Sequence, residues 1–318
     1  MTASGYLHVV KGGLLTTVQD LGRWHHQAEG VPVSGPMDAY SHRLANHLVG
    51  NAPDAATLEV TLMGPELVVE ADTVVVVTGA DFDLTCNGEP HAVGTTFAVR
   101  AGQVLRFGRR RQGARAYLAI AGGGVLTPPV LGSRATHWSA AWAASAAVPW
   151  RRGSRADRSG GRLSAAPCAG ADPADVRPRT AARPAGAPGR VVHRRGVADL
   201  HERELPYLDP PDRMGYRLEG PPLARTDDRE LISEPVAVGA IQCLPPASPS
   251  SCFGRQTAGG YPKIGYVISA DLCLAGQLAP GDFIEFERCT HAEAVAALIA
   301  RERQLMGQMT PPRGVATT

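Results

Sequence analysis

The sequence predicts a mainly β protein that is built from two modules. Short runs of β-branched and aromatic residues alternate with glycine turns over residues 1–137, and the same style returns over residues 210–318. The length agrees, because 318 residues are about twice a typical domain of roughly 150. Residues 138–209 between the modules are rich in alanine, arginine and proline and lack strand periodicity.

Several strands are predicted in the first module. The β-branched run Thr73–Thr78 continues into the alternating residues of Phe82–Cys86, which end at Asn87-Gly88, a strong hairpin turn signal. Further strands are predicted over Val104–Phe107, after a glycine turn, and over Tyr117–Ile120. In the second module, a similar glycine turn opens a strand over Phe283–Phe286.

Two helices are predicted. The first begins near Pro36, which suits a first helical position, and stops at Gly50. The second begins at Thr290, where Glu293 completes a capping box. It is expected to pack on a barrel through an apolar stripe of Ala294, Val295, Leu298, Ile299 and Leu305.

Composition excludes several classes of protein. The formal net charge is +2 and no basic stripe is interleaved with aromatics, so nucleic acid is not an expected partner. The N-terminus lacks a signal-peptide pattern and no run approaches about 20 apolar residues, so we expect a cytoplasmic protein without a membrane partner. The six scattered cysteines are expected to be reduced thiols.

Familiar catalytic motifs are absent. The sequence has no phosphate-binding P-loop, no dinucleotide fingerprint and no nucleophile elbow. The histidine pairs His25-His26 and His42/His47 lack a companion carboxylate at ligand spacing, so no metal site is predicted.

Polar clusters in glycine- and proline-rich turns are the remaining candidate sites. The first places Gln19, Asp20 and Arg23 around a bend at Gly22. The second, Gly30–Asp38, leads into the first helix, whose N-terminus would suit a carboxylate or a phosphate. In the alternative interpretation, Ser34 and Asp38 only cap that helix.

Two more clusters lie in the second module. Asp212, Arg213 and Arg217 offer two guanidinium groups to a planar anion, or form a solvated ion pair at a strand end. The run Gln256–Gly265 contains a Gly-Gly pair that permits close backbone approach. Tyr261 and Lys263 in this run are two apart, which on a strand puts both on one face.

Taken in order, these clusters resemble the KipA-type family, which includes the C subunit of 5-oxoprolinase, allophanate hydrolase subunit 2 and the carboxyltransferase part of urea carboxylase. The resemblance covers residues 1–137 and 210–290. Its specific runs, taken together, are Gln19–Arg23, Ser34–Asp38 and Gln256–Gly265, and Gly239–Gln242 also look like the family's second half. The resemblance implies two tandem cyclophilin-like β-barrels with a few short helices.

The resemblance also implies a function. A member of this kind would be the C subunit of an enzyme that opens 5-oxo-L-proline to L-glutamate with ATP. Its partners would be a KipI-like B subunit and a subunit-A-type protein, and the complex would bind the ATP. Catalytic roles are then expected for Asp20, Asp38, Tyr261 and Lys263. Substrate binding is expected from Gln19, Arg23, Ser34, Asp212, Arg213, Arg217 and Gln256.

Two alternatives stay open. The chain could belong to a biotin-dependent carboxyltransferase that acts on urea-like substrates. Because the sequence has no Met-Lys-Met attachment motif, the biotin would then be carried on another chain. In the other alternative, the chain is a non-catalytic antagonist that sequesters a KipI-like inhibitor of a histidine kinase.

The sequence departs from the family pattern in two places, residues 138–209 and 247–253. Restoring one base near His137, or reading 247–253 one frame over, gives family-like residues. We therefore hypothesise frame slips, with the family frame regained by Asp212, or else a disordered segment over 138–209. If the residues are genuine, one barrel loses apolar strand residues and its activity is expected to fall.

Overall fold

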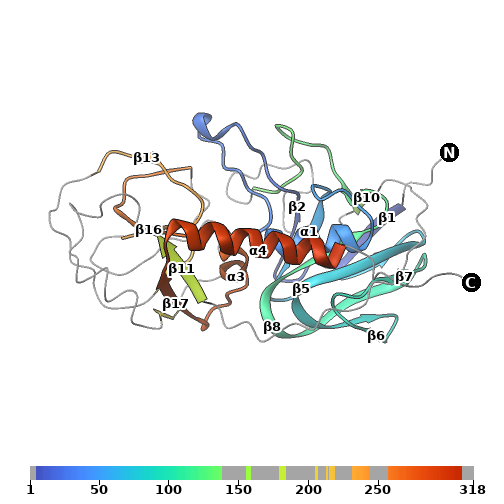
Figure 1. The fold of residues 1–318 in the computed structure, drawn as a ribbon. Helices are drawn as coiled ribbons and strands as arrows, with labels where there is room; N and C mark the ends of the chain where they lie inside the picture. The colour runs from blue at the N-terminus through green and yellow to red at the C-terminus, as the bar shows by residue number, and fades with distance from the viewer. Residues whose placement is uncertain are drawn as a thin grey trace, which may run out of the picture. The chain divides into compact units, whose positions relative to one another are not determined.

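The computed structural model describes residues 5–137, 155–158, 179–183, 205–206, 213, 215–218, 231–243 and 257–309, and it confirms the mainly β class (Figure 1). The chain divides into two compact units. Unit 1 comprises Met1–Gly22, Ala39–Ala174 and Ile299–Thr318, and unit 2 comprises Arg23–Asp38 and Asp175–Leu298. Each unit is therefore assembled from segments that are separated in the sequence. No helix among the described residues is long and apolar enough to cross a membrane.

Unit 1 contains a ten-stranded sheet in which all pairs are antiparallel. Its main path runs β2-β3-β8-β4-β1-β10-β9, and β5 pairs with β6, β7 and β8 off this path. The strands are β1 (Gly5–Lys11), β2 (Leu15–Gln19), β3 (Thr57–Thr61), β4 (Glu66–Val69), β5 (Thr73–Cys86), β6 (Glu89–His91), β7 (Phe97–Val99), β8 (Val104–Ile120), β9 (Val125–Leu126) and β10 (Arg155–Arg158).

Two long strands, β5 and β8, curl this sheet (Figure 1). The two predicted strands within 104–120 are one strand, and the predicted continuation of Thr73–Thr78 into Phe82–Cys86 is confirmed as the single strand β5. The register of the pair shifts three times between Gly79 and Leu84. Gly79 has a φ of 86°, which glycine adopts easily, and the irregularities let both strands bend without breaking.

Local signals are confirmed at the predicted hairpin and at the end of the first helix. Cys86 pairs with Glu89, and Asn87 and Gly88 have φ values of 49° and 89°, as a tight hairpin turn requires. Helix α1 (Ala39–Leu48) starts three residues later than predicted, since Pro36 precedes it and Ser34 and Gly35 have left-handed φ values. It ends at Leu48, and Gly50, the predicted stop, has a φ of 73° and donates its N–H to the His47 carbonyl.

The core of unit 1 fills the apolar side of the sheet. Leu58, Val60, Leu105 and Leu118 are fully buried there, together with Val75 and Phe82. A smaller apolar cluster joins α1 to the opposite side through Ala45, Val76 and Ala119. Both sides of this part of the sheet are therefore covered.

Unit 2 has a five-stranded sheet of order β12-β17-β11-β16-β14 and a two-stranded sheet of β13 and β15. Leu218, Ile241, Ile264 and Phe286 are buried in its core. The elements are η1 (Gln27–Glu29), β11 (Arg179–Arg183), β12 (Leu205–Pro206), β13 (Glu234–Pro235), β14 (Ala240–Gln242), β15 (Ala258–Gly259), β16 (Lys263–Val267), α3 (Leu272–Gly276) and β17 (Phe283–Arg288).

Three short strands, β10, β11 and β12, lie within the atypical segment 138–209. Periodicity did not predict them, because strands of two to five residues are defined by their pairing partners more than by alternation. The remainder of that segment lies outside the described residues, as does 247–253, so the frame-slip hypothesis stays a prediction.

Helix α4 (His291–Met309) begins with the predicted capping box. The backbone N–H of Thr290 donates to the Glu293 carboxylate at 2.6 Å, and the Glu293 N–H donates to the Thr290 hydroxyl at 3.3 Å. The predicted packing of the whole apolar stripe is wrong, because only Leu305 is fully buried while Val295, Leu298 and Ile299 are exposed. The side-chain hydrogen bonds from α4 to α1 come from its second half, where Glu302 binds Arg43 and Gln308 binds Tyr40.

Candidate functional site

A polar but buried face of the unit 1 sheet is the first candidate site. Alternate residues of β3 and β8 enter the apolar core, so their neighbours point to the other face. That face is polar, yet its side chains are at most 2% exposed. They are Thr17 and Gln19 of β2, Thr57, Glu59 and Thr61 of β3, Thr78 of β5, and Arg115 and Tyr117 of β8.

Charges on this face are compensated locally. The Tyr117 hydroxyl donates to the Glu59 carboxylate at 2.8 Å, and the Arg115 guanidinium lies 3.9 Å from the same carboxylate. Buried charges are tolerated only when they are paired and hydrogen-bonded in this way. A substitution that removes one partner is therefore expected to destabilise the unit.

His42 of α1 covers part of this face. Its Nδ1 lies 2.9 Å from the Thr57 hydroxyl, and its ring meets the Tyr117 ring edge-on at 6.1 Å. Burial lowers the pKa of His42 to about 4, although the Asp20 carboxylate opposes the shift. The imidazole is therefore neutral at pH 7, with one ring nitrogen as a donor and the other as an acceptor of hydrogen bonds.

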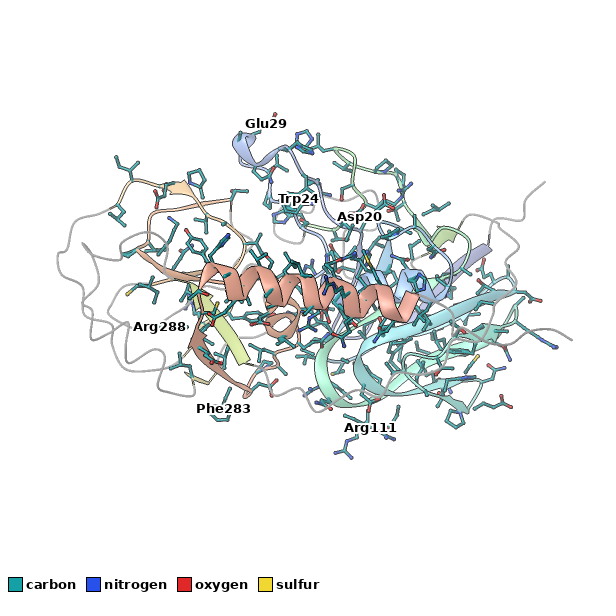
Figure 2. All side chains as sticks on the ribbon, viewed as in Figure 1. Asp20, Trp24, Glu29, Arg111, Phe283 and Arg288 are labelled. Atoms are coloured by element: carbon teal, nitrogen blue, oxygen red, sulfur yellow. The ribbon has the colours of Figure 1, made fainter. Side chains whose placement is uncertain are left out.

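Both Gln19 and Asp20 are predicted site residues and lie in unit 1. Gln19 is the last residue of β2, and Asp20, which Figure 2 labels, follows it. The Gln19 amide donates to the Thr17 hydroxyl and to the Thr136 carbonyl. The Asp20 carboxylate accepts from the Ser133 hydroxyl and from the backbone N–H groups of Gly22 and Arg134. These bonds tie the turn after β2 to residues 133–136.

The second candidate site lies in unit 2 and joins residues from both predicted modules. Arg23 donates to the Ser34 hydroxyl at 3.2 Å, and Arg213 donates to the Gly35 carbonyl. Ser34 and Gly35 have φ values of 58° and 83°, and this left-handed pair sets the direction of both acceptors. A non-glycine residue in that region costs about 1–2 kcal/mol, a strain that recurs at functional sites.

The positions of Asp38 and Arg217 do not fit a single anion-binding site that includes Arg213. The Asp38 carboxylate is buried and accepts from the Gln277 amide at 2.8 Å. Arg217 is exposed between the buried residues Tyr216 and Leu218, whereas Arg213 is buried. The two arginines of the Asp212–Leu218 run therefore face different environments, and Asp212 itself lies outside the described residues.

The third candidate site surrounds Lys263 at the start of β16. Its ammonium binds the Glu234 carboxylate of β13 at 2.6 Å. The predicted shared strand face with Tyr261 is wrong, because β16 begins only at Lys263 and Tyr261 is 40% exposed. Close backbone approach is confirmed at Gly260, where a Cβ atom would lie 2.7 Å from the Leu231 carbonyl oxygen. Gln256 lies outside the described residues.

Several buried polar residues were not predicted from the sequence. Glu59 and Thr57 alternate with apolar residues, but that pattern usually marks a solvated face. Gln242 ends a run that carries the family resemblance, yet nothing in the sequence says that its amide is buried. Two partners of predicted residues, the exposed Glu234 and the half-buried Gln277, could be found only from the fold, since Lys263 and Asp38 are 29 and 239 residues away from them.

A curled β sheet with buried carboxylate, guanidinium and amide groups is here the framework of a carboxyltransferase-type domain. The chain belongs to the family described as carboxyltransferase domain, subdomain A and B, which matches residues 29–288.

Relatives agree with this assignment. The chain is 33% identical over 301 residues to the 5-oxoprolinase C subunit of Escherichia coli K12, a match that covers 93% of this chain and 96% of the relative. The same-named protein of Haemophilus influenzae is 32% identical over 279 residues, 87% of this chain and 89% of the relative. Urea amidolyase of Lachancea kluyveri is 43% identical over 129 residues, 40% of this chain and 7% of the relative.

Solved structures extend the likeness. The crystal structure of TTHA0988 has a TM-score of 0.80 and 31% identity, and covers 90% of this chain. This chain spans 57% of that chain's length. The Kluyveromyces lactis urea carboxylase has a TM-score of 0.84 and 26% identity, and the match covers 98% of this chain and 30% of that one.

Proposed function

We propose that this chain is the C subunit of an ATP-dependent 5-oxoprolinase complex that opens 5-oxo-L-proline to L-glutamate. The observation that carries the proposal is the nearly end-to-end match to a protein of that name, over 93% of this chain and 96% of the relative. By contrast, the urea amidolyase match covers 40% of this chain. A KipI-like B subunit and a subunit-A-type protein would complete the enzyme, and ATP would bind to the complex.

Chemistry supports this choice. An unstrained lactam opens only after its carbonyl oxygen is activated, and phosphorylation by ATP would do this. The resulting negative charge needs preorganised donors in a site that excludes water. Arg23 and Arg213, which are 1% and 7% exposed, are buried guanidinium groups of the kind that bind carboxylates and phosphates.

The test is reconstitution. The chain would be co-expressed with the KipI-like partner and combined with the subunit-A-type protein, and 5-oxoproline-dependent ATP hydrolysis would be measured. Turnover is expected to fall in the variants Arg23→Ala and Lys263→Ala. Lys11→Ala is a matched control, since Lys11 is exposed and binds Glu66 on the surface of unit 1. Unchanged turnover in both test variants would remove these two residues from the site.

A carboxyltransferase is the second candidate, favoured by the family description and by the urea carboxylase structure that covers 98% of this chain. Biotin would then be carried on another chain. Carboxyl transfer from carboxybiotin to urea, without ATP hydrolysis on 5-oxoproline, would support this candidate against the first. A stable complex that catalyses neither reaction would favour a non-catalytic antagonist.

A further inference from the structure

Gln242 is a buried polar residue whose side chain has no hydrogen-bond partner among the described residues. It is the last residue of β14 and is 1% exposed. Neither its amide nitrogen Nε2 nor its amide oxygen Oε1 is hydrogen-bonded within the described part of the chain. An unsatisfied buried donor or acceptor is costly, so folded proteins rarely keep such a group without a role.

The local backbone places the Gln242 amide beside Gly259. The register of β14 against β16 shifts between Ile241 and Gln242, and such irregularities re-aim a side chain. A Cβ atom added to Gly259 would lie 3.5 Å from Oε1 and 3.6 Å from Nε2. Because residue 259 is glycine, its own side chain does not cover the donor or the acceptor from that direction.

An ion pair between Lys263 and Glu234 lies next to Gln242 and Gly259. Lys263 is the register partner of Gln242, and Glu234 is the register partner of Gly259. The Lys263 ammonium and the Glu234 carboxylate bind each other at 2.6 Å, and Glu234 is the more exposed of the two, at 62% against 8%. A ligand that carries its own carboxylate would be able to replace Glu234 on Lys263.

We propose that Gln242 is the specificity-determining residue for a cis-amide, with Lys263 holding a carboxylate on the same ligand. A primary carboxamide presents one acceptor and one donor side by side. A lactam or a ureide presents N–H and C=O on one edge and completes both bonds, whereas an ordinary trans peptide presents them on opposite edges. This inference rests on the proposed function, whose substrate is a lactam that carries a carboxylate.

Two variants test the pairing from opposite sides. Gln242→Met removes both polar atoms at similar length, and Gly259→Ala puts a methyl group in front of an intact amide. The Cβ would meet Val236 at 3.3 Å and Gly259 has no left-handed φ, so the second variant should fold with a small adjustment. Gln112→Met is the control, since Gln112 is exposed on β8. Thermal unfolding of each purified variant verifies folding.

The assay uses the reconstituted complex with 5-oxo-L-proline, and with the isosteric lactone as a competitor that lacks the N–H donor. We expect the wild type to bind the lactam at least about 10-fold more tightly than the lactone, since one hydrogen bond is replaced by a lone-pair clash. Gln242→Met should raise KM about 10-fold or more and abolish this preference. Gly259→Ala should raise KM similarly, and the control should match the wild type.

The outcomes separate this inference from the proposed function. If the complex turns over 5-oxoproline and Gln242→Met keeps the wild-type KM and lactam preference, the inference is wrong while the function stands. If the wild-type complex shows no turnover, calorimetry on the full chain with 2-pyrrolidone and with urea decides. Binding that Gln242→Met abolishes would support cis-amide recognition, and no binding to the wild type would refute it. Should Gln242→Met fail to fold, Gln242→Glu tests the lost donor in the same assays.

Discussion

His42 makes a pH-dependent contribution to stability that follows from its burial. The folded protein holds the pKa of His42 at about 4, below its ordinary value of 6.5, because desolvation disfavours the imidazolium. Between these two pH values, the unfolded chain binds a proton that the folded chain does not. Stability from this residue is therefore complete above pH 6.5 and is lost as the pH falls toward 4.

The magnitude follows from the two pKa values. Over the full window, the shift corresponds to about 3 kcal/mol of unfolding free energy. Between pH 7 and pH 5, linkage gives a loss of about 2 kcal/mol, because the unfolded state is almost fully protonated at pH 5 and the folded state is not. His42→Gln removes this titration while keeping a polar side chain opposite Thr57.

The assay is urea unfolding at several pH values, with the wild type and His42→Gln compared at each one. Contributions from other groups are common to both proteins and cancel in the difference. We expect the stability advantage of the wild type to shrink by about 2 kcal/mol from pH 7 to pH 5. A difference that is flat with pH would refute the buried, neutral imidazole.

Three further predictions concern single bonds and turns. Tyr117→Phe removes the donor to the buried Glu59 carboxylate and should lower the unfolding free energy, measured in urea, by about 2 kcal/mol. The control Tyr266→Phe, at a half-buried tyrosine, should lower it far less, and equal losses in the two variants would contradict the argument. Gly88→Ala should cost about 1 kcal/mol in the same measurement, because φ is 89° and the added Cβ meets nothing within 4 Å, so only backbone strain acts; no loss would show that the turn relaxes freely. Thr290→Val breaks the capping box, so hydrogen exchange should accelerate at the first amides of α4; unchanged exchange there would show that the box does not hold the helix end.

Local features of the fold were predictable from sequence, while contacts between distant residues were not. Asn87-Gly88 and Thr290 with Glu293 act within four residues, and the structure confirms both. The continuity of β8 was hidden, because Gly108 and Gly113 interrupt its apolar pattern. The bend at Gly79 lets β5 follow β8. The alternation of side chains that predicts a strand gives no indication of this bend.

The candidate site shows the same division. The sequence indicated which turns carry guanidinium and amide groups, but not their partners. Arg213 and Gly35 are 178 residues apart, and no local pattern joins them. Polar alternation in β3 is typical of a solvated face, and only the covering elements reveal that Glu59 is buried. Lys263 appeared as a lone charge because Glu234 is 29 residues away.

The discontinuous make-up of unit 2 has a consequence for synthesis on the ribosome. Residues 23–38 emerge early, but the Arg213 side chain that holds Gly35 follows 178 residues later. At about 5–20 residues per second, that interval lasts roughly 10–35 s. During this interval the rest of unit 2 is not yet available to cover the apolar side chains that are buried in the finished protein, Val31, Val33 and Met37. Nascent chains that stall before residue 213 would therefore be natural clients of chaperones.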